Sequence, residues 1–308
     1  MAPWHARAAA VRFAMARGAL FAATAVLVLV GAGSMARAEP PQTKGSEIDT
    51  EHLFGFNIGT DIGAVGDKEI ESELDGRFGK RTGSYGALSP MLGFEFIPAD
   101  NLRLEASAAA AAHEIAGVAG LDDRRQAAFQ GLAFEARYRL LDRARSAFGL
   151  AIKAEPHWGQ LDERSGAPVD LYGVDLAILA DKELIPKRLI GVVNLLYQPE
   201  AIRSRITGAW ARDTTAGAST GLMLHVRPDF FIGAEARYLR AYDSAGFDNF
   251  AGHALFLGPT TFAKLSQHWW TSAALSIQVV GRAVAAPGAL DLRNFERYQA
   301  KFRLGYNF

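Results

Sequence analysis

Acidic and basic residues recur two positions apart at several places in this 308-residue sequence. The pairs are Arg103-x-Glu105, Glu135-x-Arg137, Lys153-x-Glu155 and Glu235-x-Arg237. On a β-strand, side chains two positions apart point to the same face, so each pair shares a face. Such faces can select ions and small polar solutes through their local field, or they can form ion-pair networks that fill an interior. The spacing leaves both alternatives open.

Other kinds of chemistry have little support in the sequence. The chain has no Cys, which excludes a thiolate metal site and a cysteine nucleophile. We find no phosphate-binding loop, no calcium-binding loop and no metal-ligand spacing, so we expect neither a cofactor nor a metal. The 33 basic and 33 acidic residues balance, which argues against a nucleic-acid partner.

The last fifteen residues, Asn294–Phe308, show the clearest strand pattern in the chain. One parity is apolar and carries Tyr298, Ala300, Phe302, Leu304, Tyr306 and Phe308. The other parity is polar and carries Arg297, Gln299, Lys301, Arg303, Gly305 and Asn307. One face of this strand therefore needs an apolar covering, and lipid would supply it.

This C-terminal strand resembles the assembly signal of bacterial outer-membrane β-barrels, which ends in Phe after apolar residues at alternate positions. The resemblance implies that the barrel assembly machinery reads Phe302, Leu304, Tyr306 and Phe308. It also implies that the protein lies in the bacterial outer membrane, among its lipids and lipopolysaccharide. It selects no subfamily, because twelve-stranded barrels include channels for acidic oligosaccharides and nucleosides as well as lipid-modifying enzymes.

The first residues predict export. Arg7, Arg12 and Arg17 precede the apolar run Ala19–Gly33, and Ala36-Arg37-Ala38 supplies a small-x-small cleavage site. The apolar run is shorter than the ~20 residues that a spanning helix needs, so we expect cleavage after Ala38. The predicted domains are a signal peptide at 1–38, a short periplasmic lead at 39–50 and an outer-membrane β-barrel at 51–308.

Alternation of apolar and polar residues continues through the rest of the chain and predicts an all-β fold, an antiparallel up-and-down transmembrane barrel of about twelve strands. The predicted strands are Glu51–Val65, Tyr85–Ile97, Leu102–His113, Phe129–Leu141, Ala147–Trp158, Leu171–Ala180, Leu189–Gln198, Thr215–Val226, Phe230–Tyr242, His253–Lys264, Trp269–Val280 and Asn294–Phe308. Short turns alternate with longer connections, such as the charged Gly66–Gly83, which we interpret as an external loop. The facing of Leu189–Gln198 and His253–Lys264 stays open.

If the polar parity faces the lumen, it supplies a charged lining. The predicted lining residues are Asp61, Glu95, Arg103, Glu105, Glu135, Arg137, Arg139, Lys153, Glu155, Asp175, Glu235, Arg237, Arg297, Lys301 and Arg303. Eight strands leave a filled lumen and sixteen leave an open channel, so twelve predict a narrow path. Arg297, Lys301 and Arg303 share one face of the last strand with no acid among them, which favours a slight preference for anions. The alternative is that acids on a neighbouring strand, such as Asp61 on the closing first strand, neutralise them.

We therefore expect a narrow, porin-like passive channel for small hydrophilic solutes. One alternative is a hydrolase that modifies lipid or lipopolysaccharide in the lumen or at the rim, using His113, His157 or His253. The same parity puts these three and His225 on the inward face, and we identify no serine beside a lipid-facing histidine. The other alternative is a closed structural barrel.

Overall fold

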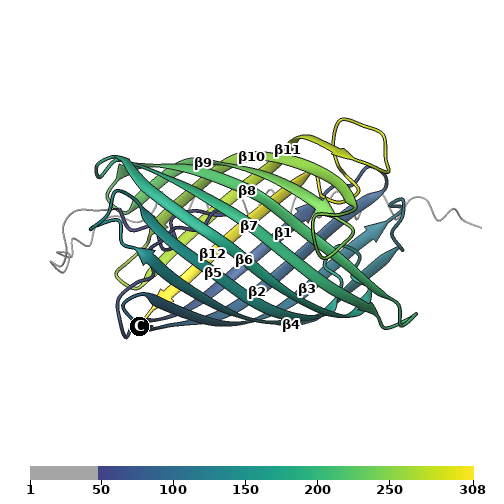
Figure 1. The fold of residues 1–308 in the computed structure, drawn as a ribbon, viewed down its shortest axis with the longest axis horizontal. Coiled ribbons are helices and arrows are strands. Elements are labelled where there is room, and N and C mark those ends of the chain that lie inside the picture. The colour runs from purple at the N-terminus through teal and green to yellow at the C-terminus, as the bar shows by residue number, and fades with distance from the viewer. Residues whose placement is uncertain (1–47) are drawn as a thin grey trace, which may run out of the picture. The chain divides into compact units, whose positions relative to one another are not determined.

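The computed structural model describes residues 48–308, which form a closed barrel of antiparallel strands (Figure 1). The predicted signal peptide and most of the predicted lead lie outside the described residues. The strands are β1 (Lys68–Phe78), β2 (Ser84–Ala99), β3 (Leu102–Ala116), β4 (Arg124–Leu141), β5 (Gly149–Leu161), β6 (Pro168–Ile185), β7 (Leu189–Ser204), β8 (Trp210–Arg227), β9 (Phe230–Tyr242), β10 (Phe250–Lys264), β11 (Trp269–Ala283) and β12 (Tyr298–Asn307). No described helix is long and apolar enough to cross a membrane.

Each strand pairs with its sequence neighbours, and β1 closes the barrel by pairing with β12. The register places Glu69 opposite Asn307, so β1 begins and β12 ends at the same end of the barrel, which we call the turn end. We call the opposite end the loop end. The connections at the turn end are 100–101, 142–148, 186–188, 228–229 and 265–268, and those at the loop end are 79–83, 117–123, 162–167, 205–209, 243–249 and 284–297.

The predicted all-β, twelve-stranded, up-and-down barrel is confirmed. Most of its strands extend further than the alternation suggested, so the connections at the loop end are shorter than predicted except for 284–297, which is the longest of them. The last strand begins at Tyr298 rather than at Asn294, and Arg297 belongs to the preceding loop. Short turns at one end and longer loops at the other match the asymmetry of outer-membrane barrels.

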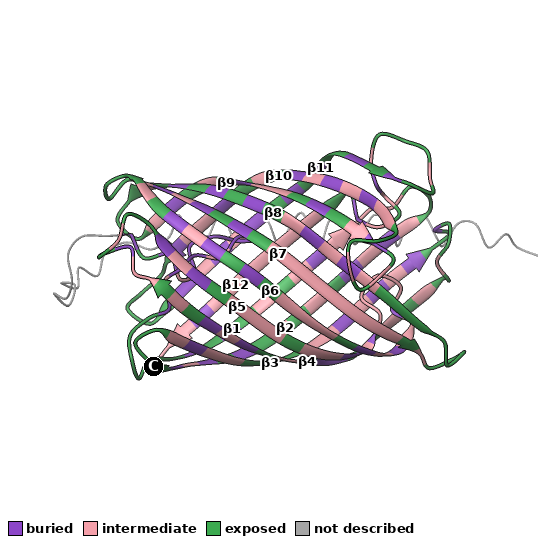
Figure 2. Cartoon of the chain, viewed as in Figure 1, coloured by how far each residue is buried: buried purple, intermediate pink, exposed green. Residues whose placement is uncertain are grey.

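The barrel wall has apolar residues outside and charged residues inside. Phe134 is 46% exposed while its neighbour Glu135 is 6% exposed, which reverses the usual order of a soluble protein. Buried and exposed positions alternate in the same way along the other strands (Figure 2). A wall of this kind needs a lipid solvent on its outside, and the closed ladder has no free strand edge to expose to it.

The first predicted strand is wrong. Glu51–Val65 forms no strand, and β1 is instead Lys68–Phe78, within the stretch that we predicted to be an external loop. The apolar and small residues of Glu51–Val65 alternate as a strand would, but this segment lies inside the barrel, where Phe54 is 1% exposed and Asn57 is 2% exposed. Its alternation therefore does not separate a lipid face from a lumen face.

Candidate functional site

Residues 48–66, which we call the inner segment, fold into the lumen from the turn end and return to it. Ile48 N donates to Glu183 near the end of β6, and Gly66 N donates to the Ile97 carbonyl near the end of β2. Between these points the segment reaches inward, where Phe54 packs among the buried side chains of Ile190, Met223 and neighbouring residues. The inner segment thus occupies the lumen on the turn-end side.

Glu235 on β9 holds the deepest part of the inner segment. Its carboxylate accepts hydrogen bonds from the backbone N–H groups of Gly55, Phe56 and Asn57 at 2.7, 2.8 and 3.0 Å. The Asn57 side-chain amide donates to the same carboxylate at 3.0 Å. Glu235 is only 4% exposed, so this buried charge is compensated by converging donors from the segment.

A second anchor lies closer to the turn end. Asp181 on β6 accepts from the hydroxyl of Thr50 at 2.7 Å and from the backbone N–H of Thr60 at 2.8 Å. Arg143, in the turn before β5, donates to Asp181 at 2.6 Å and to Asp61 of the segment at 2.7 Å. The ends of the inner segment are therefore joined to each other and to the wall by one buried network.

One side chain of the wall makes the two hydrogen bonds to the segment backbone that a neighbouring strand would make. The amide of Asn194 on β7 accepts from Ile58 N at 2.8 Å and donates to the Ile58 carbonyl at 2.9 Å. Asn194 is 1% exposed, so its amide has these partners in place of water. No backbone ladder joins the described part of the segment to a strand, which leaves the segment held mainly by side chains.

Space around the inner segment is tight. A Cβ atom placed on Gly55 would lie 2.3 Å from the Cβ of Ala274 on β11, and one placed on Gly221 of β8 would lie 3.0 Å from the ring of Phe54. On the far side, His52 stacks on Trp270 with ring centroids 4.0 Å apart. Contacts therefore run from β6 through β12, and the segment fills this side of the lumen.

His52 also faces a group of carboxylates on the wall. Its Nε2 lies 3.2 Å from Glu69, and burial lowers the pKa of His52 to about 3, so the ring is neutral at pH 7. Ligand atoms of His52, Glu69 and Glu71 lie within 4.8 Å of one another, which is close enough for a metal ion. However, Trp270 donates to Glu69 and a guanidinium holds Glu71, so these acids already have partners.

The lumen wall of β1–β5 carries a row of acids beside a row of bases. The acids Glu69, Glu95, Glu105 and Glu135 lie directly opposite one another across β1–β4. The bases Arg103, Arg137 and Lys153 do the same across β3–β5. Ion pairs join the two rows, including Arg103–Glu105 at 2.8 Å and Lys153–Glu135 at 2.9 Å. Each row of like charges is thus neutralised by the other.

The bases of β12 have acidic partners across the closing pair of strands. Lys301 lies 2.6 Å from Glu73, and Arg303 contacts Glu71 through Nε at 2.6 Å. Asp75 lies 3.3 Å from Lys301. The alternative that acids of the closing strand neutralise Lys301 and Arg303 is therefore confirmed. The acids are not Asp61 but residues of β1, which the sequence pattern had assigned to a loop.

Two connections fold inward at the loop end. Glu163 in 162–167 pairs with Arg77 of β1, and the carbonyl of Glu163 lies 3.0 Å from His113 Nε2. The Arg77 guanidinium holds the pKa of Glu163 below its usual value. In 284–297, Phe295 packs on Phe256 inside the barrel. These loops narrow the lumen at the end opposite the inner segment.

A cavity of about 590 Å³ lies between the inner segment and the two inward loops. Ten predicted residues line it: Arg103, Glu105, Glu135, Arg137, Lys153, Glu155, Asp175, Arg237, Lys301 and Arg303. Arg237 has no ion-pair partner among the described residues, and its guanidinium lies 3.8 Å from the Phe56 ring centroid and 2.5 Å from the Gln299 amide oxygen.

The other five predicted residues lie elsewhere. Glu235 holds the inner segment and Asp61 belongs to it, as described above, and Glu95 is buried and pairs with Arg103. Arg139 donates to the Asp100 carbonyl at the turn end. Arg297 is exposed in the loop before β12.

The histidines divide between the two faces of the wall. His113 and His157 face inward, and His157 lies 3.5 Å from Glu200. His253 was predicted to face inward, but it packs against the exposed Tyr238 on the outer face, because Ala254 takes the inward position. Among the described residues, no serine hydroxyl is hydrogen-bonded to a histidine ring.

Several site residues escaped the sequence analysis. Glu69, Glu71, Glu73 and Asp75 alternate with Ile70, Ser72, Leu74 and Gly76, which is the period of a strand, but the density of charge suggested a loop. Arg143 and Asp181 lie in or beside turns and carried no local signal. Their roles arise from contacts with residues more than 80 positions away.

The closed wall, apolar outside and charge-lined inside, defines a membrane-spanning β-barrel of the bacterial outer-membrane type. The chain belongs to the family described as "Family of unknown function (DUF6662)", which matches residues 46–308. No curated protein matches the sequence.

Several solved structures are similar to this chain at low sequence identity. The COG4313 outer membrane channel from Pseudomonas putida F1 is 13% identical over 81% of this chain and 98% of that chain, with a TM-score of 0.57. The translocator domain of autotransporter NalP from Neisseria meningitidis is 14% identical over 81% and 91%, with a TM-score of 0.45. The NanC porin is 15% identical over 76% and 98%, with a TM-score of 0.42.

Proposed function

We propose that this protein is an outer-membrane channel whose lumen is closed by the inner segment and opens when that segment leaves the wall. The observation that carries the proposal is how the segment is held. Glu235, Asp181 and Asn194 bind it through side chains, whereas the barrel closes on itself without it. The segment can therefore move without breaking a strand ladder.

The proposed solutes are small and hydrophilic. The cavity wall carries paired acids and bases, and an apolar ligand would instead be met by apolar side chains. Because acids and bases alternate on the cavity wall, we expect the channel to discriminate only weakly between anions and cations. Since Lys301 and Arg303 are paired, the slight anion preference now rests on Arg237, which faces the cavity without an acidic partner among the described residues.

The proposed location is the bacterial outer membrane, with the turn end in the periplasm. Lipids and lipopolysaccharide would then cover the apolar wall. Phe302, Leu304 and Tyr306 lie in β12 and Phe308 directly follows it, and the barrel assembly machinery would read these four residues. The mature chain would begin after Ala38.

Conductance of the purified protein in a planar bilayer tests this proposal. The expected result is a low open fraction for the intact protein and frequent opening for a variant lacking residues 48–64. Both proteins should migrate as folded, heat-modifiable barrels. If the deletion variant folds and passes no current, the channel function is refuted.

The tight packing of the inner segment favours one second candidate, a closed structural barrel. In that case the segment and the charge network fill the lumen to stabilise the wall. This candidate predicts that removing the segment lowers the thermal stability of the barrel and leaves the bilayer silent.

A further inference from the structure

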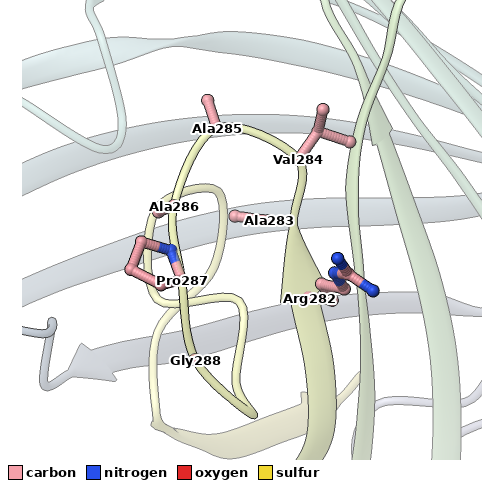
Figure 3. A pocket seen from close by; sticks show the side chains of 7 residues that line it. All are labelled: Arg282, Ala283, Val284, Ala285, Ala286, Pro287 and Gly288. Atoms are coloured by element: carbon pink, nitrogen blue, oxygen red, sulfur yellow. The ribbon is translucent and has the colours of Figure 1, made fainter.

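Three basic residues lie side by side on the outer face of the wall near the loop end. The register places His253 of β10 directly opposite Arg240 of β9 on one side and Arg282 of β11 on the other. Leu239, Ala254 and the residues flanking Arg282 are buried toward the lumen, so strand alternation turns the three bases outward. Figure 3 shows Arg282 and Ala283 on opposite sides of their strand.

The row has no acidic partner among the described residues. Neither arginine nor His253 forms an ion pair with any described residue, and adjacent strands put the two arginine backbones only about 10 Å apart. Two other outward bases near the loop end do have acidic neighbours. Arg125 lies opposite Glu114 in the register, and Arg205 lies 2.6 Å from Asp170. The row on β9–β11 thus carries uncompensated positive charge.

Aromatic side chains surround the row. The Arg240 guanidinium lies 4.6 Å from the Phe250 ring centroid, and His253 stacks on the same ring at 6.2 Å. His253 also packs against Tyr238 at 5.8 Å. Aromatic rings are typical of the depth at which lipid headgroups begin, and there an outward Arg destabilises a barrel far less than at the bilayer midplane. A hollow of about 620 Å³ at the loop end of β11 is lined by Arg282 and residues 283–288 and leaves room for a headgroup.

From this arrangement we propose that the row Arg240, His253 and Arg282 binds a phosphate group of lipopolysaccharide in the outer leaflet. A phosphate offers several acceptor oxygens to planar guanidinium groups and would remove the repulsion between the arginines. The hollow would receive the attached sugar. This inference rests on the proposed outer-membrane location, but it does not depend on whether the lumen conducts.

Binding of lipid A to the purified, full-length barrel in detergent tests the proposal. Bound lipid is counted by native mass spectrometry for bisphosphorylated lipid A and for the same lipid without phosphates. We expect Arg240→Gln/Arg282→Gln to weaken binding of the phosphorylated lipid at least about tenfold, the factor set by one lost charge-assisted hydrogen bond. The unmodified protein should bind the dephosphorylated lipid about as weakly as the variant binds the phosphorylated lipid.

The matched control is Arg125→Gln/Arg205→Gln, which removes two outward bases that have acidic neighbours. Its affinity for the phosphorylated lipid should stay within about twofold of that of the unmodified protein. Equal binding of the two lipids to the unmodified protein would overturn the proposal. So would an Arg240→Gln/Arg282→Gln variant whose affinity for the phosphorylated lipid is within about twofold of that of the unmodified protein. Heat-modifiable migration and an unchanged bilayer conductance show that each variant is a folded barrel, and they separate this result from the proposed channel function.

Discussion

Replacement of Glu235 by alanine should release the inner segment and open the lumen. In the structure the Glu235 carboxylate accepts three backbone N–H groups, from Gly55, Phe56 and Asn57, and one side-chain amide. Alanine removes this acceptor and leaves buried donors without a partner. The barrel ladder does not depend on this side chain, so the wall should still form.

The size of the effect follows from these bonds. A hydrogen bond to a charged group contributes about 1.5 kcal/mol at the lower end of its range, so losing the three backbone bonds weakens seating of the segment by about 4–5 kcal/mol. Each 1.4 kcal/mol is a factor of about ten, so the ratio of open to closed channels should rise about a thousandfold or until it saturates. Glu235→Gln keeps one acceptor oxygen and should give a smaller rise.

Single-channel recording in a planar bilayer measures this ratio directly. The matched control is Glu155→Ala, which removes another inward carboxylate whose partner is Lys153 on its own strand rather than the inner segment. This control should leave the open fraction near that of the unmodified protein. A variant lacking residues 48–64 sets the upper limit of opening.

Two outcomes would refute this reasoning. If Glu235→Ala keeps the closed behaviour while the deletion variant opens, Glu235 is not the anchor that the geometry indicates. If Glu155→Ala opens the channel as often as Glu235→Ala, loss of any lumen charge is sufficient and seating of the segment is not the cause.

Four further outcomes can be measured. Arg143→Ala should speed amide exchange in residues 48–52, because it breaks the network at the turn end while leaving the deeper anchor intact. Arg303→Gln should shift the reversal potential toward cations, since acids of β1 lose their partner; an unchanged potential would show that this pair does not face the solute path. Deletion of Phe308 should lower the amount of inserted barrel, and equal insertion would contradict its proposed role. Glu163 has a lowered pKa in the folded protein, so its pairing with Arg77 contributes above about pH 4 and is lost as pH falls further; amide exchange in 162–167 should rise only there.

Much of the wall was predictable from the sequence because strand facing is a local property. Phe302 and Leu304 point out and Lys301 and Arg303 point in for no reason other than the period of two. The same period predicted pairs such as Arg103 with Glu105, which the structure joins at 2.8 Å. An even number of alternating stretches then predicted a barrel whose ends meet.

The error at the first strand has a physical cause. Phe54, Phe56 and Ile58 alternate with small and polar residues, which is the pattern of a wall strand. Inside the lumen, however, most of the segment is buried against the wall, and the polar groups of the wall take the place of a ladder. Local alternation cannot distinguish these two environments, because both reward apolar side chains.

The sequence by itself determined the all-β class, the strand periodicity, the faces of most strands and the charged character of the interior. Only the tertiary structure decided which stretch closes the barrel against β12, and therefore which acids neutralise Lys301 and Arg303. It also decided that Glu235 and Asp181 hold the inner segment. The face to which a side chain points depends on residues one and two positions away. Its ion-pair and hydrogen-bond partners depend instead on how β1 pairs with β12 and on contacts between residues more than 100 positions apart, which no local pattern encodes.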